Sequence, residues 1–322
     1  MSPAAGAALA DVAWWWWIVL TLAAASAQTA RNAMQKGLTG SLGTVGATLV
    51  RFLFGLPFAV VSLCGVLLVT GAAIPAASAS FVGWVAFGGL TQIAATALML
   101  AAMRQRSFVV ATAYVKTEAI QVAVFGLVFL SEKLSPVAVT AIVTATAGVF
   151  LMSWPRGVRQ QVVDAASEHR GGSWKPVLMG LFAGSFFAGS AVGFKGAIVA
   201  LGAGGGGSGS FVMDATFTLV CGLLLQTVLL TSWQLIGDRR VLIAMLRAWR
   251  PSLLAGFMGA LASQMWFLAF AIATTAHVRT LALVEILLAH ALSRRLFSQH
   301  TSRAEMLGIA LVVAGAFLLI ND

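Results

Sequence analysis

The chain has 322 residues, of which 60% are hydrophobic and only 9% are charged. Soluble domains carry about 25% charged residues, so this composition excludes an ordinary water-soluble globular protein. The net charge of +10 does not indicate nucleic-acid binding, because the Lys and Arg residues lie in short segments between apolar runs. It is typical of the positive-inside bias of membrane proteins and of attraction to anionic lipid headgroups.

The apolar runs are long and unbroken, which predicts an all-α polytopic membrane protein. Each run is close to the ~20 residues that a helix needs to cross a bilayer, and a helix satisfies its own backbone hydrogen bonds in lipid. The ten predicted transmembrane helices are 12–33, 44–69, 80–103, 107–130, 136–154, 175–199, 211–236, 252–274, 277–296 and 303–320.

The least hydrophobic stretch, 155–174, is predicted to be a polar connecting loop. It separates a first half, 1–154, from a second half, 175–322, with five predicted helices in each. The loops that would share one face of the membrane hold most of the Lys and Arg residues. By the positive-inside rule, both termini are predicted to be periplasmic in a bacterial-type inner membrane.

The two halves repeat each other in sequence. A shift of 167 residues superposes 131–150 on 298–317 and carries Glu118 onto Glu285. Since five is an odd number, the second copy would enter the membrane upside down relative to the first. Two inverted five-helix repeats are a common ground plan of secondary transporters.

Glu118 and Glu285 lie inside predicted helices, where a charge costs roughly 2.5–3.5 kcal/mol near the bilayer centre. One interpretation is that both face a central cavity and bind a substrate ammonium or exchange protons. The alternative is that each pairs with a neighbouring base and only holds helices together. Tyr114, one helical turn before Glu118, is predicted to share its face and to form a hydrogen bond with it.

Lys116 is two residues from Glu118, so the two side chains point about 200° apart on a helix. We therefore expect Lys116 to meet either Asp214 or a substrate carboxylate. Arg51 opens the second predicted helix and either contributes to the substrate site or snorkels to an interface.

Further polar residues lie inside or at the ends of predicted spans. Arg31 and Lys195 correspond at a shift of 164 and either bind anionic groups or anchor helix ends. Gln92 and Gln264 correspond at a shift of 172 and either contact substrate or join helices by hydrogen bonds. Trp266 is either an aromatic wall of the cavity or part of the helix packing.

No metal or cofactor is predicted. The two cysteines lie singly in apolar runs, and the four histidines form no cluster with metal-ligand spacing. No nucleophile–base or phosphate-binding motif is present, so an enzyme is not expected.

Three segments carry a family resemblance: RFLFGLPFAV from Arg51, LSEKLSPVAVTAIVTATAGVFLM at the end of the first half, and FSQHTSRAEMLGIALVVAGAFLL at the end of the second. In this order the chain resembles the drug/metabolite transporter superfamily in its ten-helix EamA form. The resemblance implies a central cavity lined by helices 1–4 and 6–9. Members are commonly drawn with cytoplasmic termini, whereas the charge distribution here predicts periplasmic ones. Small multidrug relatives carry a coupling glutamate in the first helix, where this chain has no acid after Asp11.

The predicted function is secondary transport by alternating access. The substrate class expected first is an amino acid or related zwitterion, exported, with protons as a candidate coupling ion. The alternatives are an importer of a vitamin-like aromatic compound, a lipid flippase, a membrane-embedded enzyme, or a non-transporting assembly partner. One chain would form a complete cavity, so a monomer in contact with lipid is expected.

Overall fold

A computed structural model describes residues 15–105, 111, 114–153, 175–203, 208–287 and 303–322. Within these ranges the chain forms helices and no strand, as predicted. Five segments are long and apolar enough to cross a membrane: Trp16–Thr70, Ala79–Gln105, Leu178–Gly202, Phe211–Gly237 and Trp249–Ile272. These are the helices of a multi-pass membrane protein.

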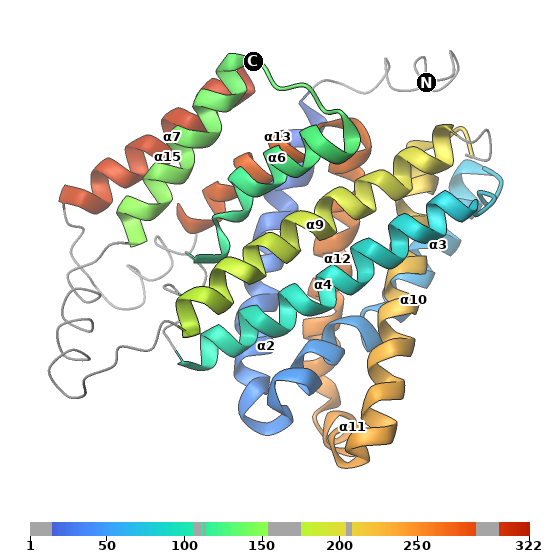
Figure 1. The fold of residues 1–322 in the computed structure, drawn as a ribbon. Coiled ribbons are helices and arrows are strands. Elements are labelled where there is room, and N and C mark those ends of the chain that lie inside the picture. Colours follow the sequence, from blue (N-terminus) through green and yellow to red (C-terminus); the bar gives the residue numbers. More distant parts are fainter. Residues whose placement is uncertain (1–14, 106–110, 112–113, 154–174, 204–207, 288–302) are drawn as a thin grey trace, which may run out of the picture.

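The helices pack side by side in a single bundle (Figure 1). In chain order they are α2 (Trp16–Leu53), α3 (Leu56–Thr70), α4 (Ala79–Gln105), α6 (Glu118–Leu130), α7 (Pro136–Ser153), α9 (Lys175–Ala203), α10 (Phe211–Gly237), α11 (Arg239–Arg247), α12 (Trp249–Ile272), α13 (Thr275–Leu281), the 3₁₀ helix η1 (Ala282–Val284) and α15 (Arg303–Ile320).

Helix α2 differs from the prediction in its length. The segment 34–43 was expected to be a loop, but it is helical, and α2 continues to Leu53 through a kink at Gly43. Gly43 has φ 68° and ψ 178°, a backbone conformation that only glycine adopts readily. The second predicted span, 44–69, is in turn interrupted by a turn at 54–55. A single glycine thus redirects the chain without ending the helix.

Side chains cap the starts of α7 and α11. Ser135 Oγ accepts a hydrogen bond from Ala138 N at 2.9 Å, so it caps α7, with Pro136 at the first helical position. Asp238 Oδ1 accepts from Arg240 N at 3.0 Å and caps the start of α11.

Three pairs of helices pack along their lengths: α4 with α9, α2 with α12, and α7 with α15 (Figure 1). The last pair stands at one edge of the bundle. A Cβ added at Gly148 of α7 would lie 2.7 Å from Gly308 O, and one added at Gly315 of α15 would lie 2.8 Å from Ala141 O. These glycines therefore let the two backbones touch.

Compared with a soluble protein, more apolar side chains lie on the surface and more polar side chains lie in the interior. Large apolar side chains such as Leu68, Val69 and Ile236 are exposed, which suits a surface in contact with lipid. The buried interior of α2, by contrast, carries a polar stripe at one-turn spacing, formed by Arg31, Asn32, Gln35 and Thr39. Arg31, the charged member of this stripe, belongs to the candidate site.

Candidate functional site

Seven ionisable side chains are buried among the residues that the structure describes. Asp214 of α10 is one of them, and the other six form a group inside the bundle. They come from three parts of the chain: α2, the segment around the start of α6, and the segment from α13 to the residue after η1. They are Arg31, Arg51, Lys116, Glu118, Arg279 and Glu285. We call this set the buried charge cluster. Buried charges in a membrane protein require partners, a polar cavity or a function.

Each acid of the cluster pairs with a base from the other half of the chain. Lys116 Nζ donates to Glu285 Oε2 at 2.5 Å, with both side chains buried. Glu118 Oε1 lies 3.1 Å from Arg279 Nε, but the N–H is not aligned for a hydrogen bond, so this is an ion pair only. Of the two predicted arrangements, pairing with bases is the one observed.

Lys116 was expected to meet Asp214 or a substrate carboxylate, and the pairing with Asp214 is wrong. Asp214 Oδ1 instead accepts hydrogen bonds from Ser208 N at 3.1 Å and from Ser208 Oγ at 3.0 Å. Asp214 therefore ties the segment before α10 to the first turn of that helix. Lys116 reaches Glu285 because the backbone turns at 116–117, whereas the prediction assumed one continuous helix.

Both acids stand just after a break in their helices. The predicted span 107–130 contains a turn at 116–117, and α6 begins only at Glu118. In the predicted span 277–296, α13 ends at Leu281, the 3₁₀ turn η1 follows, and Glu285 comes next. Broken helices bearing polar residues are typical of transporter substrate sites.

The break before α6 is held against α9. A Cβ added at Gly184 would lie 2.9 Å from Thr117 Oγ1 and 2.9 Å from Val115 O, so only glycine allows this approach. A Cβ added at Gly180 would lie 2.5 Å from the Cβ atom of Tyr114. The Tyr114 side chain thus packs on α9, while its backbone carbonyl accepts from Thr117. No contact between Tyr114 and Glu118 is found among the described residues, so the predicted hydrogen bond between them is not present.

Arg279 is the member of the cluster that the sequence interpretation missed. It was placed near a helix end, yet it is buried in α13. Its guanidinium carbon lies 4.4 Å from the Trp266 ring centroid and 5.3 Å from that of Phe270, both on α12. The signal was available, because Arg279 falls inside the predicted span 277–296. Trp266 is therefore a cation–π partner and packs in the bundle, where its Nε1 donates to Gln28 Oε1 at 3.1 Å.

Arg31 and Arg51 are buried without an acidic partner among the residues described. Arg31 Nε and Nη2 donate to Asn32 Oδ1 at 3.2 and 2.6 Å. Arg51 Nη1 and Nη2 donate to Thr96 Oγ1 and Ser263 Oγ at 3.1 and 3.4 Å. Snorkelling of Arg51 and anchoring of Arg31 at a helix end are both wrong, because α2 is longer than predicted and packs its polar stripe inward.

Lys195, the counterpart of Arg31 in the sequence repeat, has a capping role. Its Nζ donates to the backbone carbonyls of Phe270 and Ala273, at the C-terminal end of α12. A cation at this end of a helix interacts favourably with the last carbonyl groups.

The two predicted glutamines join helices. Gln92 of α4 accepts from Gln226 Nε2 of α10 at 2.8 Å. Gln264 of α12 donates to Thr216 Oγ1 of α10 at 2.9 Å and also lines a pocket of about 180 Å³ between α3 and α12. The interhelical interpretation is therefore the observed one for both residues.

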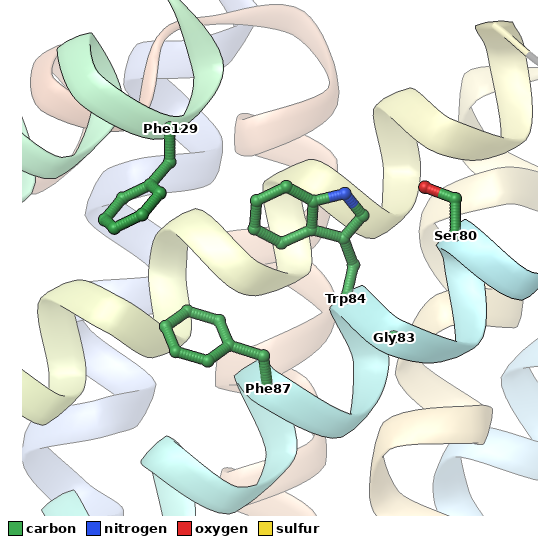
Figure 2. A pocket seen from close by; sticks show the side chains of 5 residues that line it. All are labelled: Ser80, Gly83, Trp84, Phe87 and Phe129. Atoms are coloured by element: carbon green, nitrogen blue, oxygen red, sulfur yellow. The ribbon is translucent and has the colours of Figure 1, made fainter.

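One pocket is an open, apolar depression of about 380 Å³. Trp84 and Phe87 project from α4 toward Phe129 of α6, with Ser80 and Gly83 along its rim (Figure 2). It contains no charged side chain, and neither it nor the pocket at Gln264 is lined by Glu118 or Glu285. Each side chain of the buried charge cluster is at most 7% exposed in this conformation.

Comparison with known proteins gives the fold and no activity. No family model matches the chain, and no curated protein matches it. A crystal structure described only as that of a protein is similar over 93% of this chain and 95% of its own, with a TM-score of 0.60 and 15% sequence identity. At this identity the likeness shows that the arrangement of helices occurs in another protein over nearly its whole length.

Proposed function

We propose that the chain is a secondary transporter that moves a small organic metabolite across the inner membrane by alternating access. The observation that carries the proposal is the buried charge cluster, six ionisable side chains in the interior of a bundle whose exposed surface is largely apolar. A bundle with only a structural role has little need of them, because charges are costly in hydrocarbon and apolar packing would serve.

The proposal includes ten spans arranged as two inverted repeats, as in the EamA form of the drug/metabolite transporters. The proposal is supported by contacts between segments that are equivalent in the sequence repeat. Gly148 contacts the region of Gly308, and Gly315 contacts the region of Ala141. Because 141 and 308, like 148 and 315, are separated by the repeat shift of 167, the contact between α7 and α15 is self-complementary, as across a two-fold axis.

The ion pairs fit the same scheme. Glu118 and Glu285 are repeat equivalents, and each binds a base from the opposite half next to a helix break. Exchange of these pairs would accompany rocking of one half against the other. Such paired acids and bases at broken helices are the parts that transporters place at their central site.

Counterflow in proteoliposomes tests the proposal. Vesicles loaded with unlabelled glutamate, alanine, succinate or choline would be assayed for uptake of the same labelled compound. We expect uptake of at least one compound by the wild-type protein and by the exposed-residue control Arg247→Gln. We expect its loss in the double variant Lys116→Met/Glu285→Gln, which removes a buried pair without leaving an unpaired charge.

Absence of counterflow for the whole panel in the wild-type protein would contradict the proposal. So would full activity of the double variant, because the cluster would then serve only to hold helices together.

A further inference from the structure

The buried charge cluster has an excess of positive charge. It contains four bases, Arg31, Arg51, Lys116 and Arg279, against two acids. The acids are already engaged by Lys116 and Arg279. Arg31 and Arg51, both on α2, therefore have no acid in ion-pair contact among the residues that the structure describes.

The hydrogen bonds of the two arginines are incomplete as well. All their partners are neutral side-chain oxygens, on Asn32 for Arg31 and on Thr96 and Ser263 for Arg51. Within the described part of the chain, Arg31 Nη1 and Arg51 Nε have no hydrogen-bond partner. A buried guanidinium has five donors and carries a large desolvation penalty, so two such groups with unmatched donors are suited to binding an anion.

The two side chains converge although 20 positions separate them in sequence, because the kink at Gly43 lies between them. A Cβ added at Gly259 of α12 would lie 3.1 Å from Arg51 Cγ and 3.3 Å from Arg31 Cδ. Gly259 therefore provides the space that both stems share. Both arginine stems therefore pack against α12 at this position.

We infer that Arg31 and Arg51 bind the carboxylate or phosphate group of a negatively charged substrate. The inference rests on the proposed transport function and narrows its substrate class. The planar fork of arginine matches the paired oxygens of carboxylates and phosphates, and it does so more strongly than a lysine. An anion at this place would neutralise the excess charge and take up the unmatched donors.

A purely structural role accounts for the arginines less well. The observed bonds to Asn32, Thr96 and Ser263 each need only a polar N–H, which a glutamine would supply without a buried charge. A zwitterionic substrate also fits less well than a net anion, because its ammonium would enter a positive cluster whose acids are already paired. The inference therefore favours a net anion over the zwitterion expected from the sequence.

Ligand-induced thermal shift of the purified full-length chain tests the inference. The probes are succinate, glutamate, inorganic phosphate, alanine and choline at equal ionic strength. We expect one or more of the three anions to raise the melting temperature, and alanine and choline to leave it unchanged. Response to succinate or glutamate assigns a carboxylate, and response to phosphate alone assigns a phosphate.

Variants locate the binding. Arg31→Gln and Arg51→Gln should each weaken the apparent affinity about 10- to 100-fold, as expected for lost charge-assisted hydrogen bonds. Arg247→Gln, on the exposed face of α11, should bind as the wild type does. Without ligand, both glutamine variants should melt at or above the wild-type temperature, because a buried unpaired charge has been removed. A structural role would lower it.

Gly259→Ala keeps both charges and serves if the glutamine variants do not fold. Its added methyl group crowds both stems, and we expect weaker anion binding. Absence of a shift with all three anions, or a shift unaffected by the Arg31, Arg51 and Gly259 substitutions, would overturn the inference. Counterflow of a neutral or cationic compound without anion binding would leave the transport proposal standing alone. Anion binding at these residues without counterflow would support the anion site and contradict the transport proposal.

Discussion

The ion pair between Lys116 and Glu285 stabilises the fold only when both partners are present. The ion pair spans 2.5 Å in a buried setting, so removing one partner leaves the other charged and desolvated. We expect Lys116→Met or Glu285→Gln alone to lower the free energy of unfolding by about 3–5 kcal/mol. The double variant should recover most of this loss. Melting temperatures of the four proteins in one detergent measure the cycle, and additive losses would contradict the pairing.

Trp266 holds Arg279 by its ring face and Gln28 by its N–H, and these two roles can be separated. Trp266→Phe keeps an aromatic face and loses only the hydrogen bond. Trp266→Leu loses both. We expect the leucine variant to be less stable than the phenylalanine variant by about 0.5–2 kcal/mol, the range for a cation–π contact. Equal melting temperatures of the two variants would contradict a stabilising cation–π interaction between Trp266 and Arg279.

Helix α2 depends on one glycine in a conformation closed to other residues. At Gly43, with φ 68° and ψ 178°, alanine should cost roughly 1–3 kcal/mol. Gly40, three residues earlier, has open space around it and ordinary helical geometry, so alanine there should stabilise by roughly 0.5–1 kcal/mol. The two variants should therefore shift the melting temperature in opposite directions. A shift of the same sign for both would be inconsistent with the kink.

The pair α7 and α15 should respond to a side chain at either of its equivalent glycines. Gly148→Val and Gly315→Val each place atoms against the backbone of the partner helix, and we expect losses of about 1–3 kcal/mol for each. Gly65→Val, on α3 with no neighbour within 4 Å, is the matched control and should be tolerated. Melting curves compare them, and a control as unstable as the two variants would count against close backbone contact.

The helical elements could be predicted from hydrophobicity, because apolar runs near the bilayer thickness permit little else. The start of α7 followed from Ser135 and Pro136, which carry their own capping signal. The breaks before Glu118 and Glu285 could not be predicted. Neither contains glycine or proline, and they depend on packing against other helices, such as α9 at Gly184.

The acids of the candidate site were predictable from the sequence, and so were Lys116 and Arg51 as candidates, whereas the burial of Arg31 and Arg279 was not. Glu118 and Glu285 stand out as charges within apolar spans that coincide in the repeat. Arg31 and Arg279 were assigned to helix ends, because the length of α2 and the burial of α13 follow from tertiary contacts. Which base meets which acid depends on how the two halves face each other, and spacing along one helix does not contain that information.

At the scale of the whole molecule, alternating access requires the buried charge cluster to open in turn to each side of the membrane. In the present conformation Ser263, which accepts from Arg51, is 2% exposed and inaccessible. A transporter must bring this position into contact with water on both sides as it cycles. A rigid bundle held together by buried ion pairs would never do so.

Cysteine accessibility at this position is the most direct test. Ser263→Cys would be introduced after Cys64 and Cys221, the two native thiols, are replaced by serine. A membrane-impermeant maleimide would then be applied to right-side-out and inside-out vesicles. Alternating access predicts labelling from both sides, reduced by a bound anion. Labelling from neither side, or from one side only, would contradict it.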